Sequence, residues 1–366
     1  MRIAIVTLPF VVNYGGVLQC YALQTALERL GHGVCVLQRK VPASIRARLM
    51  VTRWIKTYLL KIETNYYGGK TDGEIVGGNF QAFIRKHIRI CYFRKWQTIS
   101  GRNIDAIVAG SDQIWRNEYF KPIKQAYLDF AKKWRGVKRV AYAASFGIDE
   151  WDYTPVETKE CAELCKLFDA VSVREASGID LCREYLGVDA VQCLDPTLLL
   201  TAGDYVKLLD GFNAPAQAKC LACYFLDETK EKEQLAVKIA EEKGLNFVKL
   251  YNPDSWTPGK TFEERLQLPI ERWIAGFRDA EFVVTDSFHG CVFSIIFNKP
   301  FVVVGNTIRG MARFRSLLSM FHLEGRLVMP GETEHFPDSP IRWEEVNEVL
   351  EREREKALSF LTQNLH

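Results

Sequence analysis

The segment Thr285–Gly290 carries residue types suited to acid–base chemistry. An apolar run ends at Thr285-Asp286, and a helical pattern begins at once with Ser287. A helix N-terminus binds anions through its free N–H groups and its positive dipole end, and His289 in the first turn could protonate a ligand held there. The alternative is that Asp286 or Ser287 only caps the helix while His289 is a packed residue. The position of His289 behind an expected strand favours the functional interpretation.

Polar or glycine-rich segments also follow other expected strands, at 13–16, 110–115 and 144–147. Glycine allows a ligand to approach the backbone closely, and Asp112 with its neighbours could bind sugar hydroxyls while an aromatic face covers the ring. Ordinary tight turns, a capping Asp112 and a buried Trp115 are the alternatives. The candidate residues for binding a sugar, as the acceptor of a transferred group, are Asn13, Tyr14, Gly15, Gly16, Ser111, Gln113, Trp115 and Ser145.

Arginines follow two more of the expected strands. Arg174 comes directly after the run 170–173, while Arg309, Arg313 and Arg315 follow the run 301–304. The planar guanidinium matches the oxygens of carboxylates and phosphates, so arginines at these positions could hold an anionic ligand. Exposed arginines on helices are usually only solvated, so their place behind the strands carries the hypothesis.

Short apolar runs alternate with helical patterns along the whole chain, which predicts the βαβ units of parallel sheets. Strands are expected at 2–8, 34–37, 104–109, 139–144, 170–173, 190–193, 220–226, 247–250, 282–285 and 301–304. Helices are expected at 17–30, 156–167, 175–186, 231–243, 269–278, 287–298 and 343–361. The prediction is an α/β protein with two tandem, doubly wound domains at 1–200 and 218–340, a linker near 201–218 and a C-terminal helix within 341–366. Ligands of such sheets bind beyond the carboxyl ends of the strands, here in a cleft between the domains.

Composition restricts the classes of function. The chain has 366 residues, of which 48% are hydrophobic. A formal net charge of +3 gives no sign of the strongly basic surface that nucleic-acid-binding domains carry. No apolar stretch reaches the roughly 18 residues of a membrane span, and the apolar start of the chain is better explained as a first strand than as a signal peptide. Ten cysteines, many within apolar runs, suit a reducing cytoplasm. The Cys220–Cys223 pair could bind zinc or act in redox chemistry, but a plain core strand is favoured.

The segment 39–61 combines basic residues with Trp54, Ile55 and several leucines. A basic amphipathic helix of this kind suits a bilayer surface, which would make the protein peripheral at the inner leaflet of the cell membrane. The alternative is an ordinary helix packed on its own domain.

Six segments, taken in this order, resemble the polysaccharide pyruvyl transferase family. They are 13–23 (NYGGVLQCYAL), 110–115 (GSDQIW), 143–147 (AASFG), 172–175 (SVRE), 194–197 (LDPT) and 285–290 (TDSFHG). The resemblance implies two Rossmann-like domains arranged as in GT-B glycosyltransferases. It also implies transfer of the enolpyruvyl group of phosphoenolpyruvate to two sugar hydroxyls, forming a pyruvate ketal and releasing phosphate.

The resemblance also implies roles for individual residues. His289 matches the family histidine and would be the general acid that protonates the methylene carbon, while Asp112 would orient or deprotonate the acceptor. The candidate donor-binding residues are Arg174, Ser287, Gly290, Arg309 and Arg313. Many family members carry Arg where this chain has Ser287. If that Arg holds the donor, Arg309, Arg313 or Arg315 would replace it here; the alternatives are a different donor or lost activity. Neither a metal site nor a cofactor is expected.

The sequence leaves three hypotheses. The leading one is a cytoplasmic pyruvyl transferase that acts on a lipid-linked or nucleotide-linked sugar of a bacterial capsule or exopolysaccharide. The second is a GT-B glycosyltransferase that uses a nucleotide-sugar. The third is a non-catalytic sugar-binding protein derived from the enzyme, an interpretation that only Ser287 supports.

Overall fold

A computed structural model describes residues 1–40, 47–48, 51–52, 55, 72–213, 219–257, 259–306, 309–332 and 336–366. Its strands form two parallel sheets, one of seven strands in the order β3-β2-β1-β4-β5-β6-β7 and one of five in the order β12-β11-β10-β8-β9. The first sheet comprises β1 (Arg2–Val6), β2 (Gly33–Arg39), β3 (Ile90–Phe93), β4 (Ala106–Gly110), β5 (Lys138–Ala144), β6 (Ala170–Val173) and β7 (Val191–Gln192). The second comprises β8 (Cys220–Tyr224), β9 (Asn246–Lys249), β10 (Phe282–Thr285), β11 (Phe301–Val304) and β12 (Leu327–Val328). We call each sheet with its helices the first half and the second half.

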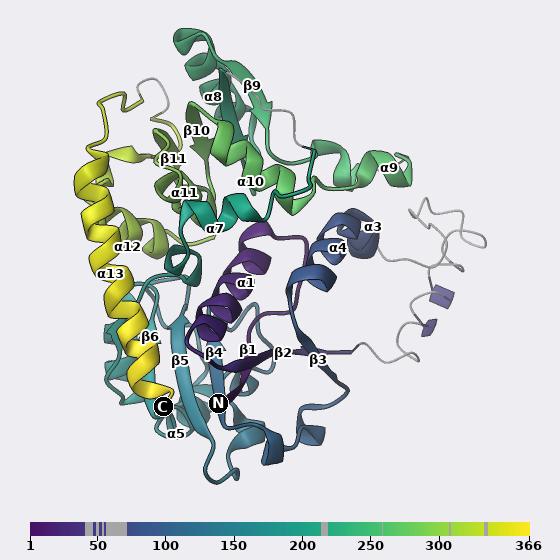
Figure 1. Ribbon diagram of the computed structural model, residues 1–366, viewed down its shortest axis with the longest axis vertical. Helices are drawn as coiled ribbons and strands as arrows, with labels where there is room; N and C mark the ends of the chain where they lie inside the picture. Colours follow the sequence, from purple (N-terminus) through teal and green to yellow (C-terminus); the bar gives the residue numbers. More distant parts are fainter. Residues whose placement is uncertain are drawn as a thin grey trace.

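Helices cover both sheets (Figure 1). Those that connect strands of the first half, or follow them, are α1 (Tyr14–Arg29), α3 (Asp72–Val76), α4 (Gly78–His87), α5 (Pro155–Cys165), α6 (Ser177–Leu181) and α7 (Ala202–Lys207). Those of the second half are α8 (Lys230–Lys243), α9 (Phe262–Arg265), α10 (Ile270–Asp279), α11 (Phe288–Ile296) and α12 (Ala312–Met320), and α13 (Trp343–Asn364) ends the chain. The predicted α/β class with two Rossmann-like sheets is confirmed, while the predicted domain boundaries stay predictions.

Two strands, β3 and β12, were not predicted. Both lie at sheet edges, and β3 exposes Cys91 and Tyr92 whereas β12 has only two residues. The predicted central strands are buried along most of their length, because a parallel sheet is covered by helices on both faces and its strands are continuously apolar. An edge strand lacks this signal.

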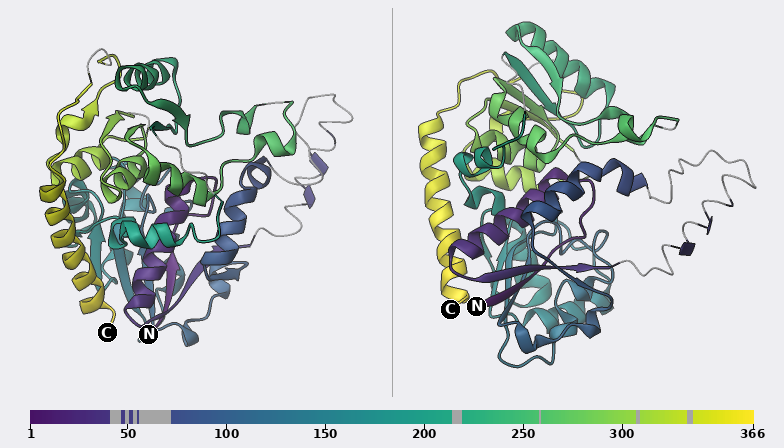
Figure 2. Two further views of the ribbon diagram at one scale, coloured as in Figure 1. Left: turned by 45° about the horizontal axis from the view of Figure 1, so that its top comes forward. Right: turned by 45° about the vertical axis from the view of Figure 1, so that its right-hand side comes forward.

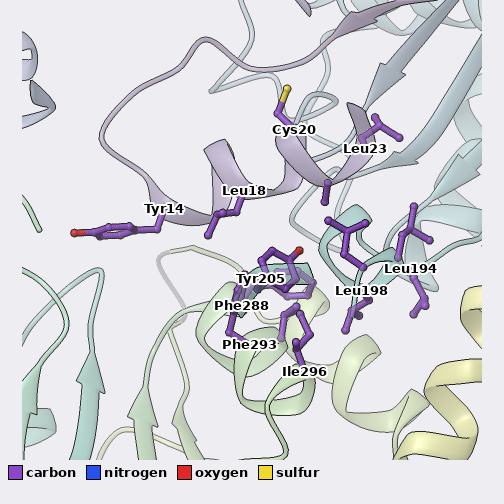
Figure 3. Close-up of a cluster of buried hydrophobic side chains, with 14 of the residues drawn as sticks. Tyr14, Leu18, Cys20, Leu23, Leu194, Leu198, Tyr205, Phe288, Phe293 and Ile296 are labelled. Atoms are coloured by element: carbon purple, nitrogen blue, oxygen red, sulfur yellow. The ribbon is translucent and has the colours of Figure 1, made fainter. Parts of the chain in front are cut away.

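One cluster of buried apolar side chains runs through both halves. Figure 3 shows Leu18 of α1 beside Tyr205 of α7 and Phe293 of α11, and the rings of Tyr205 and Phe293 are 4.8 Å apart. Tyr14, at the start of α1, stacks on Trp273 of α10 with ring centroids 5.2 Å apart. The two halves therefore share a packed core next to the first turn of α1.

Helix α13 runs along the side of both halves (Figures 1 and 2). Its Arg354 donates hydrogen bonds to the carbonyl oxygens of Leu198 (2.8 Å) and Leu200 (3.3 Å), and Leu361 is fully buried. The end of the chain thus returns from the second half to the first.

Two remaining predictions concern β8 and the basic segment. Cys220 and Cys223 lie three residues apart in β8 and pack into different core clusters, so they face opposite sides of the sheet and the core-strand interpretation is confirmed. Most of segment 39–61 lies outside the described residues, and so does the predicted membrane-surface helix. Within the described part of the chain, no helix combines the length and apolar character needed to cross a bilayer.

Candidate active site

Helix α11 begins directly behind β10 and places His289 in its first turn. Ser287 caps the helix by accepting a hydrogen bond from the Gly290 amide at 3.4 Å. Gly290 lets the helix pack onto the strand, since a Cβ there would lie 2.1 Å from Thr285 Oγ1. The cap and the close packing of α11 on β10 fix the position of His289 in the first turn, where only 6% of its surface is exposed.

The imidazole of His289 lies against the first half. A Cβ on Gly15 would stand 1.9 Å from Nδ1, so only glycine leaves room for the ring at the start of α1. On the other side, Nε2 lies 3.6 Å from Asp195 Oδ2 and is buried without a hydrogen-bond partner. The candidate acid therefore stands at the junction of the two halves.

Arg174 is a buried cation of the first half. Its Nη1 donates to Asp195 Oδ2 at 2.7 Å and its Nη2 to Asp112 Oδ1 at 3.4 Å, while the guanidinium lies 4.5 Å from the centre of the Phe288 ring. Burial alone would lower the pKa of Arg174, but Asp195, Asp112 and Glu175 outweigh it and raise the pKa. The charge of this arginine is thus fixed, and its Nε still lacks a partner.

Arg313, from α12 of the second half, approaches the same aromatic ring. Its guanidinium lies 5.7 Å from the Phe288 ring centre, and its Nη2 donates to the carbonyl oxygen of Arg309 at 2.9 Å. No carboxylate among the described residues forms an ion pair with Arg313, and its buried Nε has no hydrogen-bond partner. Burial and the neighbouring Arg174 lower the pKa of Arg313 to about 10. A desolvated cation with an unused N–H group favours the binding of an anion.

Three buried carboxylates complete the surroundings, and the sequence predicted a role only for Asp112. Asp195 accepts from Thr197 Oγ1 at 2.6 Å, and although burial opposes it, His289 and Arg174 hold the pKa of Asp195 well below its usual range. Glu175 accepts from Ser145 Oγ at 3.0 Å. Asp195 and Glu175 both lie within segments that carried the family resemblance, which is the signal that could have identified them.

The structure brings together part of the predicted set around the first turn of α1. A Cβ on Gly16 would lie 3.5 Å from Asp112 Oδ2, so Gly15 and Gly16 border the candidate acid and the candidate base respectively. Asn13 caps α1 by accepting from the Gly16 amide at 3.1 Å.

Several predicted ligand-binding side chains have structural partners instead. Trp115 is fully buried and stacks on Tyr127 with centroids 4.8 Å apart, so it forms core and no sugar platform. The Tyr14 hydroxyl donates to the carbonyl oxygen of Leu268 across the junction at 2.9 Å. The structure thus gives both side chains a structural role, which their strand-end positions do not reveal, and their acceptor roles stay predictions.

Two smaller polar groups and Arg309 also have structural partners. Ser111 donates to the carbonyl oxygen of Ala143 at 2.7 Å, and Ser145 is bonded to Glu175. Arg309 donates through Nη2 and Nε to both oxygens of Asp227, which leaves Arg313 as the available arginine of this segment. Ser287 and Gly290 act in the start of α11, as described above.

Arg116 was missed by the sequence interpretation, although it directly follows the segment 110–115. It is 8% exposed, and its Nη1 donates to Gln113 Oε1 (3.2 Å) and to the Arg309 carbonyl oxygen (3.2 Å). Arg116 and Arg313 therefore meet on one carbonyl oxygen from opposite halves.

Comparison with known proteins bears on both the family and the fold. A family model described as polysaccharide pyruvyl transferase matches residues 13–307. Arabidopsis thaliana UGT89C1, solved in complex with UDP-L-rhamnose, is similar at a TM-score of 0.52 and 10% identity, with 99% of this chain and 98% of that chain covered. UDP-GlcNAc 2-epimerase from Neisseria meningitidis gives a TM-score of 0.49 at 10% identity, with coverage of 100% and 99%. Comparison with curated protein sequences finds no match. The structural likeness concerns the fold alone.

Proposed function

Because the chain belongs to the polysaccharide pyruvyl transferase family, we propose that it transfers the pyruvyl group of phosphoenolpyruvate to two hydroxyls of a sugar, forming a ketal. The proposed acceptor is a lipid-linked or nucleotide-linked precursor of a bacterial cell-surface polysaccharide. One observation carries the proposal: Arg174 and Arg313 lie buried on either side of the junction with unused Nε groups, beside the imidazole of His289.

The donor fits this charge pattern. Phosphoenolpyruvate carries a carboxylate and a phosphate, each of which takes charge-assisted hydrogen bonds from a guanidinium. Arg174 and Arg313 would each bind one of these groups. Arg313 would then take the place of the arginine that many family members carry at the position of Ser287.

The reaction requires one proton at carbon and two new carbon–oxygen bonds. In the proposed mechanism His289 protonates the methylene carbon as the first sugar hydroxyl attacks the neighbouring carbon, and Asp112 accepts the proton of that hydroxyl. The second hydroxyl then attacks the same carbon, the bond to the phosphate oxygen breaks, and phosphate leaves with the remaining proton. The arginines stabilise the charge that develops on the departing phosphate.

The proposed location follows from the acceptor. A lipid-linked sugar would be met at the inner leaflet, with the basic segment 39–61 on the membrane surface. Sedimentation with anionic vesicles at low and high salt tests this part independently of catalysis, because an electrostatic contact weakens as salt is added.

Phosphate release in the presence of phosphoenolpyruvate and a panel of nucleotide-linked and lipid-linked sugars tests the function. Release with at least one acceptor, lost in His289→Gln, is the expected result. Donor binding is measured separately by calorimetry on wild type and Arg313→Met. The proposal fails if wild type neither binds phosphoenolpyruvate nor releases phosphate. Stabilisation by UDP in place of phosphoenolpyruvate would instead favour a nucleotide-sugar glycosyltransferase.

A further inference from the structure

One carboxylate oxygen of Asp195 faces both Arg174, a proposed donor-binding residue, and His289, the proposed acid. Its Oδ2 lies 2.7 Å from Arg174 Nη1 and 3.6 Å from His289 Nε2. Its Oδ1 is fixed by the amide (3.0 Å) and the hydroxyl (2.6 Å) of Thr197. The carboxylate is fully buried, so its orientation is set by these partners and not by water.

The two ring nitrogens of His289 have different surroundings. Nε2 is buried and faces Asp195, whereas Nδ1 lies beside Gly15, in the space that a Cβ would fill, and is not among the fully buried unpaired atoms. A buried N–H group without an acceptor is costly, so a proton on Nε2 is stabilised only if Asp195 accepts it. The other ring nitrogen, Nδ1, is then the one that takes up a second proton and can deliver it.

We propose that Asp195 is a positioning residue that holds the Nε2 proton of His289, so that when the ring carries a second proton, on Nδ1, Nδ1 is the proton-donating atom. This inference rests on the proposed function for the destination of the proton, but the Asp195–His289 contact itself does not depend on the substrate. A carboxylate behind a histidine fixes the ring orientation and the tautomer in the same way in other acid–base sites.

The gap between the two residues crosses the junction of the halves. Asp195 follows β7 of the first half, and His289 opens α11 of the second. A distance of 3.6 Å exceeds a hydrogen bond, so a movement of under about 1 Å is needed to form one. A donor that binds Arg174 of the first half and Arg313 of the second draws the halves together, and it therefore shortens this contact.

Nitrogen NMR of protein labelled in its six histidines tests the inference, with the His289 signals assigned by their loss in His289→Gln. In free wild-type protein the neutral ring is expected to carry its proton mainly on Nε2, and in Asp195→Asn this preference is lost. Asp112→Asn is the matched control, because Asp112 contacts the other terminal nitrogen of Arg174 and does not contact His289. Equal tautomer populations in wild type and Asp195→Asn overturn the proposal.

A second variant covers the case in which Asp195→Asn does not fold. Thr197→Val removes the hydroxyl that orients the Asp195 carboxylate. It is expected to shift the tautomer populations of His289 in the same direction as Asp195→Asn, but by a smaller amount. Addition of phosphoenolpyruvate should strengthen the Nε2 preference in wild type. An unchanged tautomer ratio with phosphoenolpyruvate bound would show that the donor does not shorten the contact between Asp195 and His289. If phosphoenolpyruvate does not bind, the proposed function fails while the free-protein comparison still decides the role of Asp195. In turnover, kcat of Asp195→Asn is expected to fall about tenfold or more.

Discussion

At the carboxyl edge of the second sheet, Asp286 accepts hydrogen bonds from the amides of Leu226 and Asp227, from Lys232 Nζ (2.7 Å) and from Asn306 Nδ2 (3.2 Å). The neighbouring Asp227 is paired with Arg309. Every one of these side chains stabilises the loops behind β8, β10 and β11. These polar residues of the second edge are structural.

At the carboxyl edge of the first sheet, Arg174 and Glu175 are equally buried but leave Nε and Oε2 without partners. The second half adds the unpaired Nε of Arg313 there, beside the imidazole of His289. Because native proteins rarely leave buried polar atoms unpaired, such atoms gathered at one place mark a site that is completed by a ligand. Residue type and strand-end position are alike at the two edges, and only the hydrogen-bond partners distinguish function from structure.

The sharpest test of this comparison exchanges one aspartate at each edge for asparagine. Asp286→Asn removes the charge partner of buried Lys232 and part of the loop contacts, so the free energy of unfolding is expected to fall by about 3–5 kcal/mol. Asp112→Asn leaves Arg174 paired with Asp195, and asparagine tolerates the positive φ of 63° at this position, so the change should stay within about 1 kcal/mol. Urea unfolding measures both. The distinction between the edges is wrong if the two variants lose similar stability.

The two arginines of segment 309–313 offer the next comparison. Arg313→Met is expected to weaken phosphoenolpyruvate binding about 10- to 100-fold, because it removes charge-assisted hydrogen bonds, while the fold is no less stable without an unpaired buried charge. Calorimetry and thermal melting measure the two effects.

Arg309→Met is the matched variant, since its guanidinium is already bonded to Asp227. Donor affinity is expected to stay within about threefold of wild type, less than the 1.4 kcal/mol that a tenfold change requires. Equal losses in both variants would show that Arg309 leaves Asp227 to bind the donor.

Two adjacent glycines test how closely the halves approach. Gly15→Ala places a methyl group where the His289 ring stands, so it should cost about 1–3 kcal/mol of stability or displace the ring and abolish phosphate release. Gly16→Ala makes only ordinary contacts at 3.5 Å and is expected to be neutral or slightly stabilising in the first turn of α1. Equal activity of the two variants would argue against the contact between Gly15 and His289.

The smallest expected effect is on the pH dependence of stability and comes from the Asp227–Arg309 pair at the edge of the second sheet. The hydrogen bonds from Arg309 lower the pKa of Asp227, so the pair contributes stability that is present above the ordinary aspartate pKa and is lost as the pH falls through the lowered value. Since about a third of each side chain is exposed, solvent screening limits the contribution to under about 1 kcal/mol. Unfolding of wild type and Arg309→Met between pH 6 and pH 3 should show a shallower dependence in the variant. A parallel dependence would mean that the pair contributes nothing.

The sequence predicted the fold well because its signals are local. Apolar runs identified the central strands, and the helix start at Ser287 followed from the polar residues behind β10. The edge strand β3 was missed, since its exposed residues lack the apolar run of a buried strand.

The candidate site was predicted only in part, because partners across the junction are not local. Nothing near Trp115 in the sequence indicates that Tyr127 covers its ring, and nothing near Asp195 indicates that it faces His289. Arg309 and Arg313 look alike in the sequence, but among the described residues only Arg309 forms an ion pair with a carboxylate. The direction of a side chain and the identity of its partner are set by tertiary packing, which periodicity does not report.

The return of α13 has a consequence for synthesis on the ribosome. The carbonyl oxygens of Leu198 and Leu200 and the ring of Tyr142 are contacted by residues of 343–364, which are made after both sheets. The first half can form its sheet early, but its surface is closed only after the second half has emerged. A fragment ending near residue 200 should therefore aggregate during expression, and supplying α13 as a separate peptide should improve its solubility.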